Sequence, residues 1–177
     1  MRTDWACIVT VLVTLRGNSA SGKSTVAAAV QRRFERSRCV VVPQDVVRRQ
    51  MLRESDEPGA FNVELIAQIA QACLTSGRVV IVEGILDAHR YGPMLARLTT
   101  EAPRSLHYGF DLTLAETRAR HAGRPQAATI PEQMLAQWYH GWQPLPGIDE
   151  VRIDATWTCE QIADRIYSDI VTAQQHR

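Results

Sequence analysis

A glycine-rich segment from Gly17 to Ser24 reads GNSASGKS and matches the pattern G-x-x-x-x-G-K-[ST]. Its glycines allow the backbone N–H groups to surround a phosphate, and the N-terminus of a following helix adds a favourable dipole. Lys23 would bridge the β- and γ-phosphates, and the Ser24 hydroxyl would bind Mg²⁺. The segment therefore predicts a phosphate-binding loop, the P-loop, that holds ATP or GTP with Mg²⁺. The residues expected to contact the nucleotide are Gly17, Asn18, Ser19, Ala20, Ser21, Gly22, Lys23, Ser24 and Thr25.

Asp45 and Arg48 follow an expected strand and lie three residues apart, on one face of a helix start. The carboxyl ends of parallel strands share one crevice, so Asp45 should face the γ-phosphate held by the P-loop. We expect Asp45 to orient an acceptor hydroxyl and accept its proton, and Arg48 to clamp the acceptor or the phosphoryl group. The alternative is that Asp45 only caps the following helix.

The expected third strand ends at Glu83, a position from which a carboxylate can hold Mg²⁺ through water or contact the acceptor. A hydrogen-bonded surface carboxylate is the alternative. Asp87, His89 and Tyr91 come next, in what we expect to be a loop beside the acceptor. They are candidate substrate contacts.

Arginines are concentrated in the segment ETRARHAGRP, which carries Arg118, Arg120 and Arg124. We expect residues 113–130 to form a helical lid that closes over the phosphates, with Arg120 and Arg124 stabilising the charge that develops during transfer. A solvated basic helix face is the alternative. Trp138, with Tyr139 and Trp142, is a candidate wall of the acceptor pocket, although aromatic side chains at this spacing also suit a core.

The elements that must position these residues alternate between strand and helix. Apolar runs predict strands over residues 8–15, 40–42, 79–82, 106–112 and 151–153. A helix is expected over residues 25–36, another from residue 61 to a stop at Gly77, and a third through Met94 and Leu98. Capping-box spacing marks two more helix starts, at Thr113 and Thr158. The pattern predicts an α/β fold of three layers with a five-stranded parallel sheet, in one domain of residues 1–177.

The composition narrows the function. Nineteen of the twenty basic residues are Arg, so Lys23 is the sole lysine, and an N-K-x-D guanine reader would need a second one. A chain of 177 residues also leaves little room for the trans-acting motifs of motor, transporter or AAA-type ATPases. A net charge of +1 gives no support for nucleic acid as a partner, and none for a membrane surface.

The cysteines and the N-terminus suggest a compartment. Cys7, Cys39, Cys73 and Cys159 are widely spaced, so we expect reduced core thiols in a cytoplasmic protein. The apolar run after Arg2 leads into the P-loop instead of a cleavage site, and no run approaches the ~18 residues that span a bilayer.

The P-loop, the Asp45–Arg48 pair and the Arg-rich lid together resemble the small P-loop kinases of the adenylate-kinase-like branch. That group includes chloramphenicol phosphotransferase, gluconate kinase, zeta-toxin-type kinases and the kinase domain of polynucleotide kinase. The resemblance implies that Asp45 is the general base, with Arg48 beside it. It covers nearly the whole chain in order of elements and implies a family, but no particular substrate.

These features predict a phosphotransferase that moves the γ-phosphate of ATP to a hydroxyl of a small molecule. An antibiotic or other natural product is the favoured acceptor, by analogy with chloramphenicol phosphotransferase. A sugar or nucleoside metabolite and a polynucleotide 5′-hydroxyl are alternatives. A nucleotide-binding regulatory protein without an acceptor is the alternative of another class. The oligomeric state is left open, with a homodimer as one option.

Overall fold

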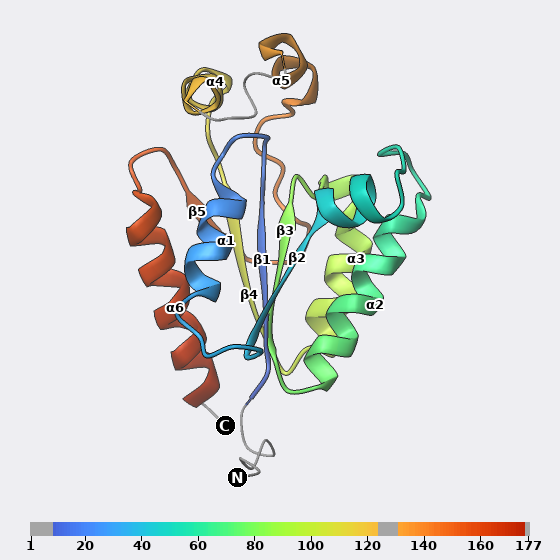
Figure 1. The fold of residues 1–177 in the computed structure, drawn as a ribbon, viewed down its shortest axis with the longest axis vertical. Coiled ribbons are helices and arrows are strands. Elements are labelled where there is room, and N and C mark those ends of the chain that lie inside the picture. Colours follow the sequence, from blue (N-terminus) through green and yellow to red (C-terminus); the bar gives the residue numbers. More distant parts are fainter. Residues whose placement is uncertain (1–8, 124–130, 176–177) are drawn as a thin grey trace.

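Five strands form a single parallel sheet in the computed structural model, which describes residues 9–123 and 131–175 (Figure 1). The strand order is β2-β3-β1-β4-β5. The strands are β1 Val11–Gly17, β2 Cys39–Pro43, β3 Val79–Gly84, β4 Arg104–Phe110 and β5 Val151–Ile153. Because every pairing is parallel, all five carboxyl ends lie at one edge of the sheet.

Helices cover both faces of this sheet, which gives the expected three layers. One face carries α1 (Lys23–Gln31) and α6 (Cys159–Gln175), and the other carries α2 (Phe61–Thr75) and α3 (Ala88–Glu101). The sheet itself is apolar on both sides. Val11, Val13 and Leu15 of β1 pack with α1 and α6, whereas Leu12 packs with α2 and α3. Burial of such side chains contributes about 1.5–3 kcal/mol each and drives formation of the layers.

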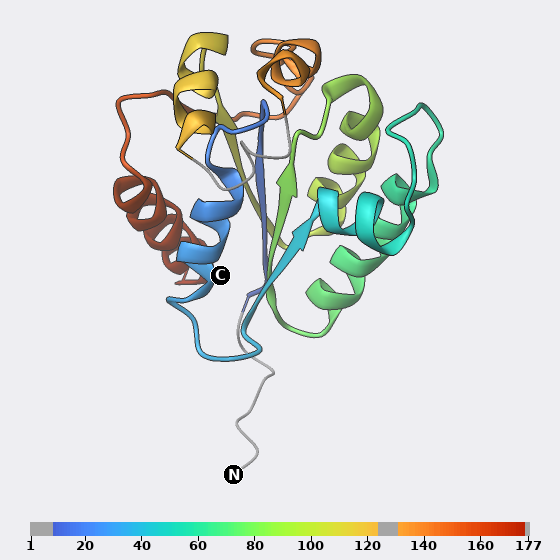
Figure 2. The ribbon, with the colours of Figure 1, turned by 45° about the horizontal axis from the view of Figure 1, so that its top comes forward.

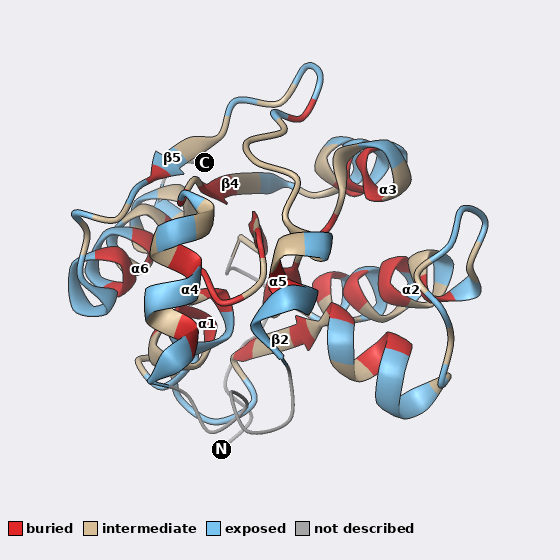
Figure 3. Ribbon diagram, turned by 90° about the horizontal axis from the view of Figure 1, so that it is seen from above, coloured by how far each residue is buried: buried red, intermediate tan, exposed pale blue. Residues whose placement is uncertain are grey.

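Three shorter helices stand at or near the carboxyl edge of the sheet: the π-helix η2 (Val46–Met51), α4 (Leu114–Ala122) and α5 (Glu132–Trp138). Figure 2 shows α4 and α5 side by side above the end of β1. Viewed from above, α5 lies over the centre of the fold and α4 over the α1 side (Figure 3). The capping box at Thr113 is present, with the Glu116 carboxylate accepting the Thr113 N–H at 2.7 Å. The expected lid of residues 113–130 is thus helical over α4, and residues 124–130 lie outside the described part.

Some expected boundaries were wrong. The helix expected to reach residue 36 ends at Gln31, because the chain tightens into i→i+3 turns and reaches Ser37 at φ 67°. Strand β1 begins at Val11, not at residue 8, and Ile8 lies outside the described residues.

Of the cysteines, Cys39 is buried as expected, Cys73 is half-buried and Cys159 is exposed, while Cys7 is not among the described residues.

Within residues 9–123 and 131–175, no helix has the length and apolar character needed to cross a bilayer.

Candidate active site

The P-loop leaves β1 with a backbone that only glycine suits at two positions. Gly17 has φ +145°, and a Cβ atom there would lie 2.5 Å from the Phe110 carbonyl oxygen. Gly22 has φ +104° and immediately precedes α1. A side chain at Gly17 would collide with β4, so the loop can follow this path only without one. Both glycines of the motif are therefore required by the loop geometry.

Lys23 lies inside the loop it belongs to. Its side chain is buried, and its Nζ atom donates to the Asn18 carbonyl at 2.7 Å and to the Ser21 hydroxyl at 3.1 Å. The ammonium group is thus already placed where phosphate oxygens would lie in a loop of this kind. Ser24 and Thr25 are exposed at the first turn of α1.

Ser24 and Glu83 are the two residues expected to hold Mg²⁺, and they suit a hard cation. The Ser24 hydroxyl is exposed beside Lys23, and Glu83 is 5% exposed at the end of β3, in register with Leu15 of β1. In the described part of the chain, no three His, Cys, Asp or Glu side chains gather as metal ligands. Phosphate oxygens and water would therefore complete the coordination, as Mg²⁺ usually requires. These two roles remain predictions.

The lid contacts the P-loop directly through Arg120. Its Nη1 atom donates to the Ser21 carbonyl at 2.7 Å and lies 3.6 Å from the position of a Cβ on Gly22. Arg118 faces away and pairs with Glu132 of α5 at 2.9 Å. Of the three lid arginines, Arg120 thus reaches the P-loop and Arg118 ties α4 to α5. Arg124 lies outside the described residues.

A segment that sequence reasoning missed joins the lid to the P-loop. We call residues 139–150, between α5 and β5, the strap. The Asn18 side chain accepts the His140 N–H at 3.0 Å and donates to the Gly141 carbonyl at 3.1 Å. Asn18 is 2% exposed, so these hydrogen bonds are shielded from water. Only the Pro and Gly residues of the strap signalled a turn, and nothing in its sequence pointed to the P-loop.

A buried ion pair holds the far end of the strap. Arg16, the residue before the P-loop, donates from Nε to Glu150 at 2.9 Å, and both side chains are at most 4% exposed. The other Glu150 oxygen accepts the Leu145 N–H at 3.0 Å. Burial raises the pKa of Glu150 and lowers that of Arg16, while the partner charge opposes each shift. The pair fixes the strap against β1.

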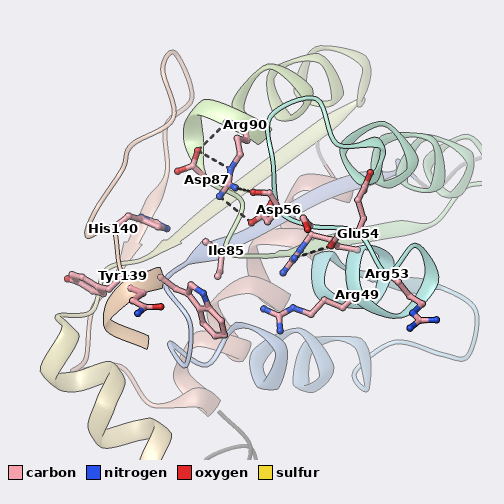
Figure 4. Close-up of a pocket in the computed structure, with 13 residues that line it drawn as sticks. Arg49, Arg53, Glu54, Asp56, Ile85, Asp87, Arg90, Tyr139 and His140 are labelled. Atoms are coloured by element: carbon pink, nitrogen blue, oxygen red, sulfur yellow. Dashed lines mark hydrogen bonds and ion pairs between the residues drawn. The ribbon is translucent and has the colours of Figure 1, made fainter. Parts of the chain in front are cut away.

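Two cavities lie near the P-loop, one lined by the loop itself and the other reaching it through His140. The smaller, of about 330 Å³, lies on the α1 and α6 side. We call it the nucleotide-side cavity, and its walls include Gly22, Thr25, Arg120, Trp157, Thr158 and Cys159. The larger, of about 670 Å³, lies under α5 on the η2 and α3 side, and we call it the acceptor-side pocket (Figure 4). Arg48, Asp87 and Trp138 from the sequence prediction line this larger pocket.

Asp45 does not line the acceptor-side pocket, but it contacts two arginines that do. Its carboxylate contacts Arg48 Nη2 at 3.3 Å and Arg49 Nε at 3.1 Å, and its side chain is 63% exposed. It makes no side-chain hydrogen bond to cap η2. The capping alternative is therefore not what the structure shows, and the role of Asp45 as general base remains a prediction. A π-helix is rare and is frequent at functional sites, which suits this position.

The loop expected to contain Asp87, His89 and Tyr91 is instead the start of α3. Asp87 caps this helix by accepting the His89 and Arg90 N–H groups at 3.0 and 3.2 Å. Burial raises the pKa of Asp87, but the hydrogen bond and charge of Arg90, with the His89 N–H, bring it below its ordinary value. His89 is exposed and does not line the pocket, and Tyr91 is fully buried. Asp87 signalled this helix start, because Asp is a preferred N-cap.

Tyr91 supports the pocket from beneath. Its hydroxyl accepts from Gln44 Nε2 at 2.6 Å and lies 2.8 Å from Asn62 Oδ1 and 3.0 Å from Asp56 Oδ1. Gln44 also accepts the Ile85 N–H at 2.9 Å. This network joins the ends of β2 and β3 to α2 and so fixes the pocket floor.

The aromatic residues divide between pocket and core. Trp138 and Tyr139 line the acceptor-side pocket, and the Arg49 guanidinium lies over the Trp138 ring, 5.3 Å from its centre. Trp142 instead packs on Gly109 of β4, where a Cβ would lie 2.3 Å from its ring. Trp138 therefore remains a candidate substrate contact, and Trp142 is structural.

A parallel sheet of this order, with a P-loop after the central strand and a helical lid above it, defines a P-loop nucleotide-binding protein. The chain belongs to the AAA domain family, whose model matches residues 12–145. This match does not test the expectation that the chain is too short for the trans-acting motifs of AAA-type ATPases. No curated protein sequence matches it significantly.

Solved structures of kinases share this fold. The APS kinase of Mycobacterium tuberculosis, solved with AMPPNP and APS, is 18% identical over 93% of this chain and 99% of its own, with a TM-score of 0.69. A gluconokinase from Sinorhizobium meliloti is 15% identical over 96% and 95%, with a TM-score of 0.65. The tunicamycin resistance protein of Deinococcus radiodurans is 12% identical over 92% and 96%, with a TM-score of 0.59. The fold prediction, and with it the resemblance to small P-loop kinases, is confirmed.

Proposed function

We propose that this protein is an ATP-dependent phosphotransferase that uses Mg²⁺ and phosphorylates a hydroxyl of a small molecule. One observation carries the proposal: a cavity of about 330 Å³ is lined by P-loop residues, and a pocket of about 670 Å³ is lined by His140, whose N–H group donates to Asn18 of the P-loop. A two-substrate transfer needs such an arrangement, with nucleotide on one side of the phosphates and acceptor on the other.

The nucleotide-side cavity suits the nucleoside of ATP. Residues of the P-loop, α1 and the lid meet the loop before α6 there, at Trp157 and Thr158. The Trp157 ring offers an apolar surface for a base. The γ-phosphate would then lie between Lys23 and Arg120, at the edge of the acceptor-side pocket.

The transfer follows from this placement. The acceptor oxygen forms a bond to the γ-phosphorus as the bond to the bridging oxygen of ADP breaks, and the hydroxyl proton passes to the Asp45 carboxylate. When bound through Ser24 and Glu83, Mg²⁺ would neutralise phosphate charge. Arg120 would exchange the Ser21 carbonyl for a phosphate oxygen as charge develops. Closure of the lid over the phosphates would exclude water, which favours transfer over hydrolysis.

The acceptor class is proposed from shape and analogy. A pocket of about 670 Å³ has the size of a small-molecule site. An antibiotic or other natural-product hydroxyl remains our favoured acceptor, and the resistance protein among the structural relatives supports it by analogy. Sugar kinases among those relatives support a sugar or related metabolite in the same way.

Two variants test the proposal. ADP release and acceptor phosphorylation would be measured across antibiotics, sugars and nucleosides, with nucleotide binding followed by calorimetry. Asp45→Asn should abolish acceptor phosphorylation and leave ATP affinity within about threefold of wild type. Lys23→Ala should weaken nucleotide binding or transfer for every acceptor. If ATP binds stoichiometrically and no hydroxyl compound is phosphorylated, the regulatory alternative replaces the proposal.

A further inference from the structure

Two buried polar atoms in the wall of the acceptor-side pocket have no hydrogen-bond partner among the described residues. They are Arg48 Nε and His140 Nε2. An unpaired buried donor or acceptor costs about 1–3 kcal/mol, so proteins rarely keep one without a use. Both atoms are buried, and both residues line the same pocket, so a ligand bound there would satisfy them if the two side chains turn toward it.

Arg48 presents a charged donor. The residue is 9% exposed, and its other two nitrogens are engaged: Nη1 donates to the Glu54 carbonyl and Nη2 to Asp45, each at 3.3 Å. A guanidinium cannot release its proton in a protein, so Nε can only donate. The strongest partner for a charged donor in a partly dry site is an oxyanion.

The carboxylates nearby are already used and do not meet this demand. Glu54 accepts the N–H groups of Phe61 and Asn62 at 2.7 and 2.8 Å, together with the Asn62 side chain. Asp56 pairs with Arg90. Figure 4 shows these groups at the side of the pocket opposite His140, with Ile85 between.

Two more arginines offer hydrogen-bond donors at the same side of the acceptor-side pocket. Arg53 lines the pocket with backbone φ +54° and has no carboxylate partner among the described residues. Arg49 uses Nε for Asp45 and keeps its remaining nitrogens over Trp138. The carboxylates at this side of the pocket thus already have partners, while the arginines retain unused N–H groups. A ligand with an anionic group would supply the missing acceptors.

His140 offers a hydrogen-bond acceptor at the side of the pocket nearest the P-loop. Its Nδ1 atom lies 3.1 Å from the Gly141 carbonyl, which can only accept, so Nδ1 carries the proton and Nε2 carries a lone pair. Burial lowers the pKa of His140, which keeps the ring neutral. Its backbone N–H is held by Asn18 of the P-loop. A ligand hydroxyl that donates to Nε2 would therefore lie beside the phosphate site.

We propose that the acceptor-side pocket binds a hydroxylated anion, with its oxyanion at Arg48 Nε and a hydroxyl donated to His140 Nε2. This inference rests on the proposed function and narrows the acceptor to a compound carrying a carboxylate, phosphate or sulfate group. A neutral natural product would leave Arg48 Nε unpaired in the pocket.

Binding measured by calorimetry with ADP and Mg²⁺ present, at fixed ionic strength, tests this without requiring catalysis. The probes are D-gluconate against D-sorbitol and glycerol 3-phosphate against glycerol, pairs that differ mainly in the anionic group. Each anion should bind at least tenfold more tightly than its neutral partner, since a charged hydrogen bond contributes about 1.5–3 kcal/mol. If the polyols bind as tightly as the anions, or if neither anion binds saturably at millimolar concentration, the proposal is overturned. If one pair alone obeys, the pocket distinguishes carboxylate from phosphate and the proposal stands.

Variants locate the two ends of the ligand. Arg48→Gln should weaken the anion that binds by about tenfold and leave the polyols unchanged. Arg53→Gln, at an exposed position, provides the same test if Arg48→Gln fails to fold, with a smaller loss. Arg36→Gln is the matched control, because Arg36 is exposed at the opposite edge of the sheet. Unchanged anion binding in both pocket variants would refute the assignment.

His140→Phe keeps the ring and removes the acceptor atom. The wild type should prefer D-gluconate to hexanoate, which has the same number of carbons and no hydroxyl. The variant should lose that preference while hexanoate binds as before. If the variant still prefers D-gluconate to hexanoate, His140 does not bind the ligand hydroxyl. Anion binding without phosphorylation of any compound would refute the proposed function alone and leave the binding inference standing.

Discussion

Removing the Glu150 carboxylate should lower the free energy of unfolding by about 3–5 kcal/mol. The Arg16 and Glu150 side chains are 4% and 2% exposed, and their 2.9 Å contact is the pairing that offsets the burial of both charges. Breaking one half of a buried ion pair leaves the other charge uncompensated, which gives a loss of that size. Glu150→Ala also removes the acceptor of the Leu145 N–H. Since small domains are typically stable by about 5–15 kcal/mol, this loss is a large fraction of the total free energy of unfolding.

The loss in free energy of unfolding can be measured by urea denaturation, with circular dichroism as the probe of unfolding. Glu57→Gln is the matched control, because Glu57 is exposed and its substitution should change stability by at most about 0.5 kcal/mol. The double variant Arg16→Met, Glu150→Leu removes both charges and should recover most of the loss. A Glu150→Ala protein within about 1 kcal/mol of wild type would refute the assignment of the ion pair as the anchor of the strap.

Three further predictions concern pH, the lid and the nucleotide. Burial lowers the pKa of His107 to about 4, below its ordinary 6.5, so the unfolded chain takes up the proton first as the pH falls. The free energy of unfolding should fall by about 2 kcal/mol from pH 7 to pH 5, and denaturation of His107→Gln should lack that part of the slope. Arg120→Gln should reduce the turnover number about a hundredfold or more with less than tenfold change in ATP affinity, and a lid arginine without that effect is not a phosphate contact. ATP should slow the alkylation of Cys159, measured by peptide mass spectrometry, and should leave the alkylation rate of Cys73 unchanged. If Cys159 reacts at the same rate with and without ATP, the nucleotide does not bind in the nucleotide-side cavity.

The fold could be predicted because its signals are local. The buried strands β1 and β3 are nearly continuous apolar runs, and α1, α3 and α4 each begin at a glycine or a capping residue. The P-loop geometry follows from Gly17 and Gly22, whose positions in the motif fix the positive φ angles that the structure shows. Periodicity gives the type of an element better than its ends, which is why the first helix was expected to run five residues too far.

The acceptor side could be predicted only in part, because its contacts join residues far apart in the chain. Asn18 meets His140 across 122 positions, and Arg16 meets Glu150 across 134. No spacing rule connects such pairs. A loop was expected over Asp87 and Tyr91, although the Asp87 cap and the apolar positions at Met94 and Leu98 favoured a helix that begins there.

Phosphoryl transfer can be followed with ATP labelled at the γ-phosphorus, incubated with the protein, Mg²⁺ and an acceptor panel of hydroxylated anions and their neutral counterparts. We expect the label to appear covalently on a hydroxylated anion, one phosphoryl group for each ADP released, and Asp45→Asn to abolish this product without abolishing ATP binding. Label recovered solely as inorganic phosphate, whichever acceptor is present, would contradict this expectation.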